Sequence, residues 1–210
     1  MNGEITAVVL AGGRSTRFGS DKASALLRGR PLLDWTVAAL VLTVAKVIVV
    51  KARGQRLPSF DCPVPCDVVE DAFEGLGPAA GLLSGFRAVS TDFAFGVACD
   101  TPLVSAKVVS YLESRSHDVD VVVPVVDGFV QPLFALYRVE ACLPVFERRV
   151  AGGELKIVPA FDHVRTARVE EADLREIDPS LQSFRNANTP ERLKEIDGLL
   201  GETQDGGTTG

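Results

Sequence analysis

ITAVVLAGGRSTRFGSDK, at residues 5–22, joins an apolar run to a loop that is rich in glycine and basic residues. The run Ile5–Leu10 is almost continuously apolar, as expected for a strand whose two faces are both covered in a parallel sheet. Gly12 and Gly13 follow it directly, and because neither carries a Cβ atom the backbone can turn sharply there. Such a loop can direct successive N–H groups toward an anion. This stretch therefore predicts an α/β fold with a ligand site at the end of its first strand.

The rest of the chain alternates apolar, β-branched runs with helical patterns, which indicates βαβ connections and a largely parallel sheet. We expect strands at 5–10, 47–50, 68–69, 93–98, 119–125, 133–137 and 164–169. We expect helices at 32–42, 79–89, 106–114, 139–149, 153–161 and 191–200. The predicted fold class is a single-domain α/β protein over residues 1–200, a Rossmann-like three-layer sandwich with a mostly parallel sheet. Residues 201–210 are polar and rich in glycine and threonine, and are predicted to form a flexible C-terminal tail.

Composition excludes several classes of protein. The 210 residues are 46% hydrophobic and 24% charged, which is far from the composition of disordered chains. The net charge is −6 and no block of lysine and arginine stands out, so we expect no nucleic-acid partner. No apolar run approaches the ~20 residues of a membrane span, so we expect no membrane association. The cysteines lack a histidine cluster and are interpreted as reduced thiols of a cytoplasmic protein: Cys62, Cys66, Cys99 and Cys142.

Three basic residues, Arg14, Arg17 and Lys22, lie within the loop segment that follows the first strand. Their spacing differs from a Walker loop, in which lysine directly follows the last glycine, and the loop lacks the G-x-G-x-x-G pattern of dinucleotide-binding folds. A plain turn with solvated cations is the alternative interpretation. However, an acidic chain that concentrates three cations beside a Gly-Gly turn favours a phosphate site.

Asp100 follows the strand expected at 93–98 and therefore lies at the edge of the sheet where open α/β folds bind ligands. A carboxylate at this place can hold Mg²⁺ while substrate phosphates and water complete the coordination shell. The alternative is that Asp100 caps a local turn or the following helix. Asp71 comes shortly after the strand expected at 68–69, where it either contacts a base or ribose or finishes a turn.

The segment NANTP at 186–190 carries two amides, Asn186 and Asn188. Residues at i and i+2 of an extended segment point to the same side, so both amides can face one ligand. The alternative is that Asn188 and Thr189 cap the last helix. GLGPAAG at 75–81 looks like a dinucleotide signature, but no clean strand leads directly into it, so we interpret it as a tight turn before a helix.

In this order, the motifs resemble the molybdenum cofactor guanylyltransferase family, a branch of the nucleotidyltransferase superfamily. The glycine loop alone marks the superfamily, whereas QPLFALY and NANTP favour this branch. The resemblance covers roughly residues 5–197. The matching segments are LAGGRSTRFGSDK at 10–22, VVED at 68–71, GPAAG at 77–81, ACDTP at 98–102, QPLFALY at 131–137 and NANTP at 186–190.

The resemblance implies transfer of GMP from Mg-GTP to molybdopterin-bound molybdenum cofactor, which forms molybdopterin guanine dinucleotide and pyrophosphate. In the family, the nucleotide is bound at the positions that match Leu10, Ala11, Gly12, Lys22 and Asp71, and Mg²⁺ at the position that matches Asp100. The family often has Asn where this chain has Arg53, so we count Arg53 only as a supporting contact. From the residues themselves we add Gly13, Asn186 and Asn188 as binding residues, and we expect catalysis by Arg14, Arg17, Lys22 and Asp100.

The residues leave other functions open. The alternative enzymes are a CTP-dependent molybdenum cofactor cytidylyltransferase and a nucleotidyltransferase for another small-molecule phosphate. A nucleotide-binding regulator without catalysis and a structural α/β scaffold are the further alternatives. We expect Gln131 and Pro132 to line the acceptor pocket, and we expect transient contact with proteins that deliver or accept the cofactor.

Overall fold

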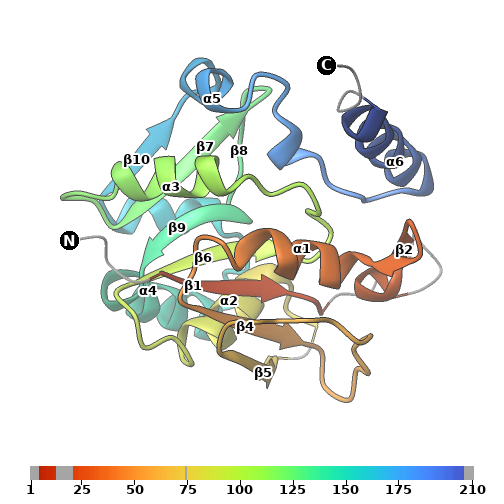
Figure 1. Ribbon diagram of the computed structural model, residues 1–210. Coiled ribbons are helices and arrows are strands. Elements are labelled where there is room, and N and C mark those ends of the chain that lie inside the picture. Colours follow the sequence, from red (N-terminus) through yellow and green to blue (C-terminus); the bar gives the residue numbers. More distant parts are fainter. Residues whose placement is uncertain (1–4, 13–20, 74, 206–210) are drawn as a thin grey trace.

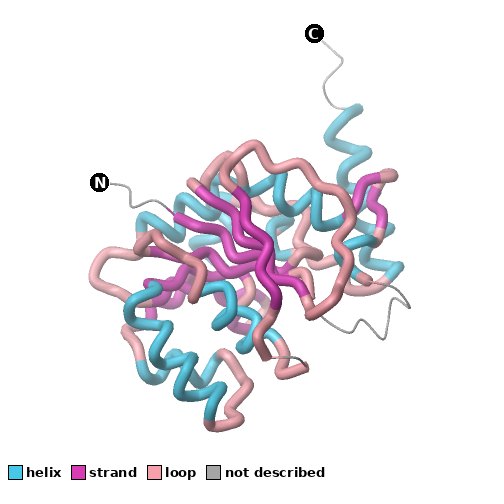
Figure 2. The backbone as a smooth tube through the Cα atoms, turned by 90° about the horizontal axis from the view of Figure 1, so that it is seen from below, coloured by secondary structure: helices cyan, strands magenta, loops and turns pink. Residues whose placement is uncertain are grey.

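The computed structural model describes residues 5–12, 21–73 and 75–205 of the chain. Helices cover both faces of one mixed sheet, so the protein is a three-layer α/β sandwich (Figures 1 and 2). The strand order is β10-β7-β9-β6-β1-β4-β5, and β8 pairs with β7 beside this path. The strands of the sheet are β1 (Ile5–Leu10), β4 (Lys46–Lys51), β5 (Cys66–Glu70), β6 (Phe93–Ala98), β7 (Val121–Val126), β8 (Phe129–Val130), β9 (Phe134–Arg138) and β10 (Thr166–Val169). A separate hairpin joins β2 (Leu26–Leu27) to β3 (Arg30–Pro31).

The parallel strands of the sheet form a block at one side. β5, β4, β1 and β6 are neighbours in that order and run in the same direction. β9 is antiparallel to both of its neighbours, β6 and β7, while β7 and β10 are parallel to each other. The predicted α/β class and its parallel core are therefore confirmed, and the carboxyl ends of β1, β4, β5 and β6 share one edge of the sheet.

Each face of the sheet has its own apolar core. Successive residues of a strand point to opposite faces, so Ala7 and Val9 of β1 belong to one core, and Val8 and Leu10 to the other. α1 (Leu32–Leu40), α3 (Ala106–Ser114) and α5 (Glu171–Ile177) cover the first face. α2 (Pro78–Phe86) and α4 (Val139–Ala151) cover the second face. Burial on both faces explains why the central strands are continuously apolar in the sequence.

α2 lies very close to the sheet at Gly85. A Cβ atom at this position would be 2.3 Å from Cγ1 of Val8, inside the van der Waals contact distance. A glycine is therefore required for this approach of helix to strand, although glycine lowers the intrinsic stability of a helix. As predicted, the GLGPAAG segment turns directly into α2, with Pro78 as the first residue of the helix.

Several elements differ from the sequence-based expectation, among them the short strands β2, β3 and β8, which were not expected. The α-helix expected at 153–161 is wrong: a short 3₁₀ helix, η2 (Val158–His163), forms instead, and Pro159 has no N–H for a continuous α-helix. α5 carries little sequence signal because only Leu174 of its residues is buried. α6 (Pro190–Asp205) continues beyond residue 200 into the segment predicted as a tail. Within the described residues, no helix is long and apolar enough to cross a membrane.

A charge cluster lies at the amino end of β7, on the edge of the sheet opposite to Asp100. Asp120 is buried and accepts hydrogen bonds from Arg165, at 2.9 Å from the backbone N and 2.8 Å from Nη2. Arg138 lies 3.7 Å from the same carboxylate. The hydrogen bond from the Arg165 side chain lowers the pKa of Asp120 below its ordinary value, against the effect of burial. This cluster fixes the start of β7 and takes no part in the site described below.

Candidate active site

The predicted site residues come together at the carboxyl edge of the parallel strands. Asp71 directly follows β5, and Asp100 lies two residues beyond β6. The start of the glycine loop follows β1 between these two strands. The carboxyl edge of parallel strands is where open α/β folds bind ligands. Residues that are distant in the sequence therefore converge on one region because of strand direction.

Among the described residues, Lys22 is the cation that joins the predicted site residues at this edge. Its Nζ donates to Oδ2 of Asp100 at 2.8 Å and to Oδ1 of Asn188 at 2.6 Å. Asp100 is only 4% exposed, whereas the Lys22 side chain is 29% exposed and can be reached from solvent. A carboxylate, an ammonium group and an amide are therefore joined in one hydrogen-bond network at the carboxyl edge of the parallel strands.

The NANTP segment packs directly against the end of β6. The backbone N of Ala187 donates to the carbonyl O of Asp100 at 2.8 Å, and Oγ1 of Thr101 donates to Oδ1 of Asn186 at 3.1 Å. The backbone N of Asn188 donates to the carbonyl O of Asn186 at 2.9 Å, so the segment makes a tight turn at Ala187. Both amides predicted as ligands thus lie beside Asp100, although the segment is bent and not extended.

The start of the glycine loop is held by β4. The backbone N atoms of Ala11 and Gly12 both donate to the carbonyl O of Val50, at 2.8 and 3.1 Å. A Cβ atom on Gly12 would lie 2.8 Å from the backbone N of Ala52. The glycine is therefore required by this close approach of two backbones. Gly13, Arg14 and Arg17, which we predicted as ligand-binding or catalytic residues, lie outside the described residues.

One contributor was not predicted from the sequence. Gln55, in the turn after β4, makes side-chain hydrogen bonds with Ala11, Asp21 and Ala52. Asp21 in turn caps the short 3₁₀ helix η1 (Lys22–Ser24), because its Oδ1 accepts from the backbone N of Ala23 at 3.1 Å. A single glutamine in a polar loop carries no local signal that would mark it as such a contact.

Asp71 and Arg53 have different surroundings. Oδ1 of Asp71 accepts hydrogen bonds from Oγ of Ser84 at 2.8 Å and from the backbone N of Phe73 at 3.0 Å, so this oxygen ties β5 to α2. Arg53 is exposed in the turn after β4. Both residues lie on the carboxyl edge of the sheet, but no contact in the described structure joins either of them to Lys22.

The residues present suit a metal that binds few protein ligands. Among the described residues, no group of three or more His, Cys, Asp or Glu side chains is arranged to hold a metal ion. Asp100 offers one carboxylate, whose Oδ2 contacts Lys22 while Oδ1 has no hydrogen-bond partner in the described structure. Mg²⁺ commonly binds one or two carboxylates and takes its other ligands from phosphates and water. The donor set therefore fits Mg²⁺ bound together with a polyphosphate.

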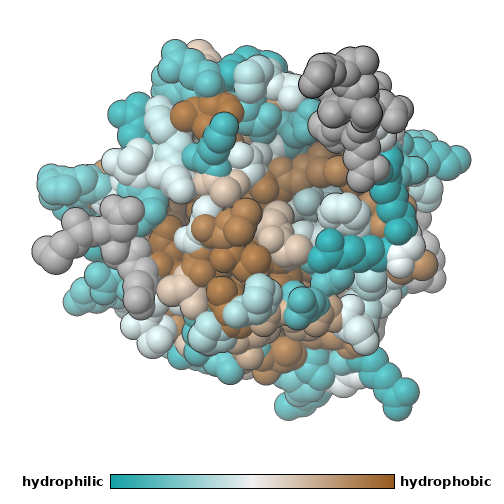
Figure 3. Space-filling view, viewed as in Figure 1, coloured by the Kyte–Doolittle hydropathy of each residue, from teal (hydrophilic) through white to brown (hydrophobic). Residues whose placement is uncertain are grey.

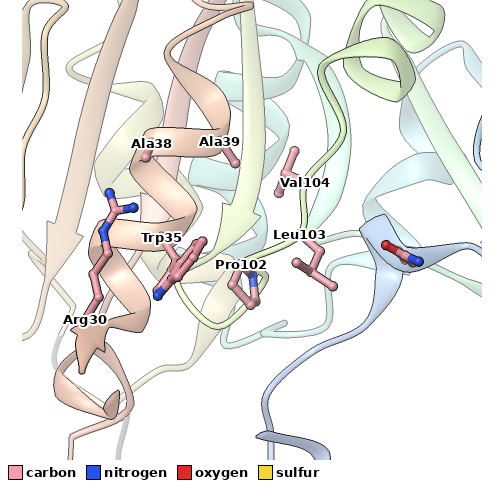
Figure 4. Close-up of a pocket in the computed structure, with 8 residues that line it drawn as sticks. Arg30, Trp35, Ala38, Ala39, Pro102, Leu103 and Val104 are labelled. Carbon is pink, nitrogen blue, oxygen red and sulfur yellow. The ribbon is translucent and has the colours of Figure 1, made fainter. Parts of the chain in front are cut away.

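A separate pocket of about 390 Å³ lies between α1 and the segment after Asp100 (Figure 4). The guanidinium group of Arg30 lies over the Trp35 ring at 4.9 Å from its centroid, and the indole N–H donates to the carbonyl O of Leu27. Figure 3 shows apolar surface on this side of the molecule, between α1 and α3. Lys22 and Asp100 do not line the pocket, so we define the site by its side-chain contacts. The lining residues are Arg30, Trp35, Ala38, Ala39, Pro102, Leu103, Val104 and Gln182.

Comparison with known proteins identifies close sequence relatives. Residues 7–164 match the family described as MobA-like NTP transferase domain. A molybdenum cofactor guanylyltransferase from Desulfosudis oleivorans is 32% identical over 205 residues, which cover 93% of this chain and 96% of that protein. A probable molybdenum cofactor guanylyltransferase from Bacillus licheniformis is 34% identical, with coverage of 90% of this chain and 95% of that protein.

Solved structures share the fold. Molybdopterin-guanine dinucleotide biosynthesis protein A from Archaeoglobus fulgidus superimposes with a TM-score of 0.77 at 24% identity, covering 94% of this chain and 99% of that one. A 2-C-methyl-D-erythritol 4-phosphate cytidylyltransferase from Thermus thermophilus has a TM-score of 0.70 at 19% identity, covering 93% and 98%. These structural similarities establish the fold alone.

Proposed function

This chain belongs to the MobA-like NTP transferase family, and from that premise we propose that it is a molybdenum cofactor guanylyltransferase. Its substrates would be GTP and molybdopterin-bound molybdenum cofactor, and its products molybdopterin guanine dinucleotide and pyrophosphate. The observation that carries the proposal is the network of Lys22, Asp100 and Asn188 at the carboxyl edge of the sheet. The reaction would take place in the cytoplasm.

The chemistry requires positioning and charge stabilisation more than acid–base catalysis. An oxygen of the acceptor phosphate forms a bond to the α-phosphorus of GTP, and the bond from that phosphorus to the bridging oxygen breaks. Pyrophosphate leaves with the electron pair of the broken bond. The acceptor phosphate is already ionised at neutral pH, so it needs no general base. Catalysis then depends on holding the reacting groups in line and on cations near the charge that develops.

Lys22 is suited to stabilise the leaving pyrophosphate. It directly follows Asp21, which caps η1, and its ammonium group reaches the centre of the site. Its side chain is 29% exposed, so a phosphate can approach Nζ from solvent. We assign the same electrostatic role to Arg14 and Arg17, which the sequence places in the loop before it.

Asp100 is the residue that would hold Mg²⁺. When bound, this ion would supply positive charge that neutralises the phosphate groups. Lys22 already neutralises the buried carboxylate, and it would exchange part of this contact for contact with the nucleotide phosphates. Asn188 would keep the Lys22 ammonium group within the site during that exchange, because its Oδ1 accepts from Nζ at 2.6 Å.

The nucleotide would lie along the ends of β1, β4 and β5. We assign Leu10, Ala11, Gly12 and Gly13 to its backbone contacts. We assign Asp71, with Arg53 as a supporting residue, to the side of the site formed by β4 and β5. Asn186 and Asn188 would contact the ligand from the opposite side, next to Asp100. Gln131 and Pro132 are our candidates for the acceptor side.

The decisive experiment is incubation of the protein with Mg-GTP and molybdopterin-bound molybdenum cofactor. We expect the guanine dinucleotide and pyrophosphate in equal amounts, measured by chromatography and by a coupled pyrophosphate assay. A thermal-shift panel of GTP, CTP, ATP and UTP with Mg²⁺ tests the choice of base. Stabilisation by CTP but not by GTP would overturn the guanylyl assignment and favour a cytidylyltransferase.

A further inference from the structure

Gln55 uses its side-chain amide to connect three separate backbone segments. Its Nε2 donates to the carbonyl O of Ala11 at 3.0 Å and to Oδ2 of Asp21 at 2.7 Å. Its Oε1 accepts from the backbone N of Ala52 at 2.8 Å. Both N–H groups and the carbonyl group of the amide therefore have partners. A half-buried glutamine with this set of partners is fixed in one orientation.

The turn that carries Gln55 is itself fixed. The backbone N of Gln55 donates to the carbonyl O of Ala52 at 3.1 Å, and Nζ of Lys51 donates to the carbonyl O of Gln55 at 3.1 Å. The backbone of Gly12 packs against Ala52 so closely that a Cβ atom would not fit. The turn after β4 is thus joined to the end of β1 by backbone packing as well as by the Gln55 side chain.

The two Nε2 contacts join points that the chain separates. Ala11 directly follows β1, whereas Asp21 directly precedes Lys22 and caps η1. The Lys22 ammonium group then contacts Asp100 and Asn188. The hydrogen bond from Gln55 to Asp21, together with the peptide bond that joins Asp21 to Lys22, therefore links Gln55 to the position of Lys22.

We propose that Gln55 is a positioning residue for nucleotidyl transfer, which holds Ala11 and Asp21 in register so that Lys22 is placed for the nucleotide phosphates. This inference rests on the proposed function, because it assigns Lys22 to those phosphates. Gln55 itself contacts neither the metal nor the reacting atoms. Displacement of a catalytic group by about 1 Å can lower the rate by about 100-fold, so a residue at this distance from the chemistry has a measurable effect.

Gln55→Glu is the informative substitution because it keeps the shape of the side chain and removes both of its donors. The new carboxylate would face the carboxylate of Asp21 and the carbonyl O of Ala11, and would repel both. We expect kcat/KM for Mg-GTP to fall by about 30-fold or more, with a larger change in kcat than in KM, because Lys22 acts most strongly on charge that develops in the transition state. The thermal unfolding midpoint is measured alongside to give the folded fraction under assay conditions.

Asp21→Asn in the Gln55→Glu background tests the contact itself. The new amide at position 21 supplies the donor that the new carboxylate needs, while its carbonyl oxygen can still cap Ala23. We expect the double variant to recover at least about 10-fold of the lost kcat/KM, since the donor and acceptor are exchanged across one hydrogen bond. If Gln55 only stabilised the fold, fully folded Gln55→Glu protein would keep its kcat, and Asp21→Asn would restore no activity in that background.

Gln182→Glu is the matched control, because it makes the same chemical change in a half-buried glutamine whose side chain makes no hydrogen bond in the described structure. We expect its kcat/KM to stay within about twofold of the wild-type value. The proposal is overturned if fully folded Gln55→Glu protein keeps its kcat/KM, or if Asp21→Asn restores nothing. If wild-type protein is stabilised by CTP and not GTP, the guanylyl assignment fails, and the same variants are compared with Mg-CTP, so the test of Gln55 stands.

Discussion

Replacement of Lys22 by alanine tests the electrostatic part of the proposed reaction. In the wild-type protein Nζ of Lys22 contacts Asp100 at 2.8 Å and Asn188 at 2.6 Å. The substitution removes one positive charge from the site and leaves the carboxylate of Asp100, whose side chain is 6% exposed, without its ion-pair partner. It does not disturb the backbone hydrogen bond from Ala187 to Asp100, so the NANTP segment should stay in place.

The expected effects on stability and on activity differ in size. A fully buried ion pair that loses one partner costs about 3–5 kcal/mol. The Lys22 side chain is 29% exposed, so water partly screens the pair, but the Asp100 carboxylate that is left behind is buried. We therefore expect a loss of about 1–3 kcal/mol in the free energy of unfolding. Loss of a group that stabilises transition-state charge typically costs about 3–4 kcal/mol, which corresponds to about 100- to 1,000-fold in rate. Lys22→Ala should therefore remain folded at 25 °C while kcat/KM for Mg-GTP falls by that factor.

The chain offers a matched control in Lys46. Its Nζ lies 2.6 Å from Asp67, and its side chain is 26% exposed, close to the value for Lys22. Because this pair is remote from the carboxyl edge of the parallel strands, we expect Lys46→Ala to change kcat/KM by less than about twofold. Pyrophosphate release and chemical unfolding of both variants give the two comparisons. A Lys22→Ala enzyme with wild-type kcat/KM, or an equal loss of activity in Lys46→Ala, would refute the assignment of Lys22 to the phosphates.

Three further predictions concern the metal ligand, the packing and the pH dependence. Asp100→Asn keeps the side-chain shape, so we expect an unchanged unfolding transition but a loss of about 100-fold or more in kcat. We also expect weaker binding of Mn²⁺ in the presence of nucleotide, measured by electron paramagnetic resonance. Unchanged Mn²⁺ binding would contradict the assignment of Asp100 as the metal ligand. Gly85→Ala places a Cβ atom 2.3 Å from Val8, so it should destabilise the protein by about 1–3 kcal/mol, and an unchanged melting temperature would contradict this packing. The pKa of Asp120 is lowered by its hydrogen bond with Arg165, so its contribution is present above the unfolded-state pKa of about 4 and is lost as pH falls through the lower folded-state value. The stability difference between wild type and Asp120→Asn in urea should therefore shrink below about pH 4, and a constant difference would contradict the shift.

Much of the fold and part of the site are readable in the sequence because their signals are local. β1 and β6 are continuous apolar runs, and each is followed at once by the residues that form the site. Asp71 and Asp100 were expected at strand ends, and parallel strands bring their carboxyl ends to one edge. The comparisons confirm the family assignment that the motifs predicted, while the roles of individual residues stay predictions.

Other features lack such a signal. α5 is short and buries only Leu174, so no apolar stripe distinguishes it from a loop. β9 runs antiparallel to both of its neighbours. The chain segments before and after a strand set its direction, and the apolar run of the strand itself contains no information about it. The pattern at 153–161 suggested an α-helix, whereas the chain forms η2, in which Pro159 lies in the first turn.

The sequence by itself determined the layered α/β fold, the strand-loop start of the site and the family, because periodicity and compact motifs act over a few neighbouring residues. Only the tertiary structure decided that Asn188 reaches Lys22 across 166 residues of chain and that Gln55 joins Ala11 to Asp21. Hydrogen bonds between distant segments depend on where the sheet places each loop, and a single asparagine or glutamine has the same local signature whether or not it has a partner. The physical reason is that hydrophobic patterning encodes which residues are buried, whereas polar contacts form only after the buried strands have set the positions of the loops.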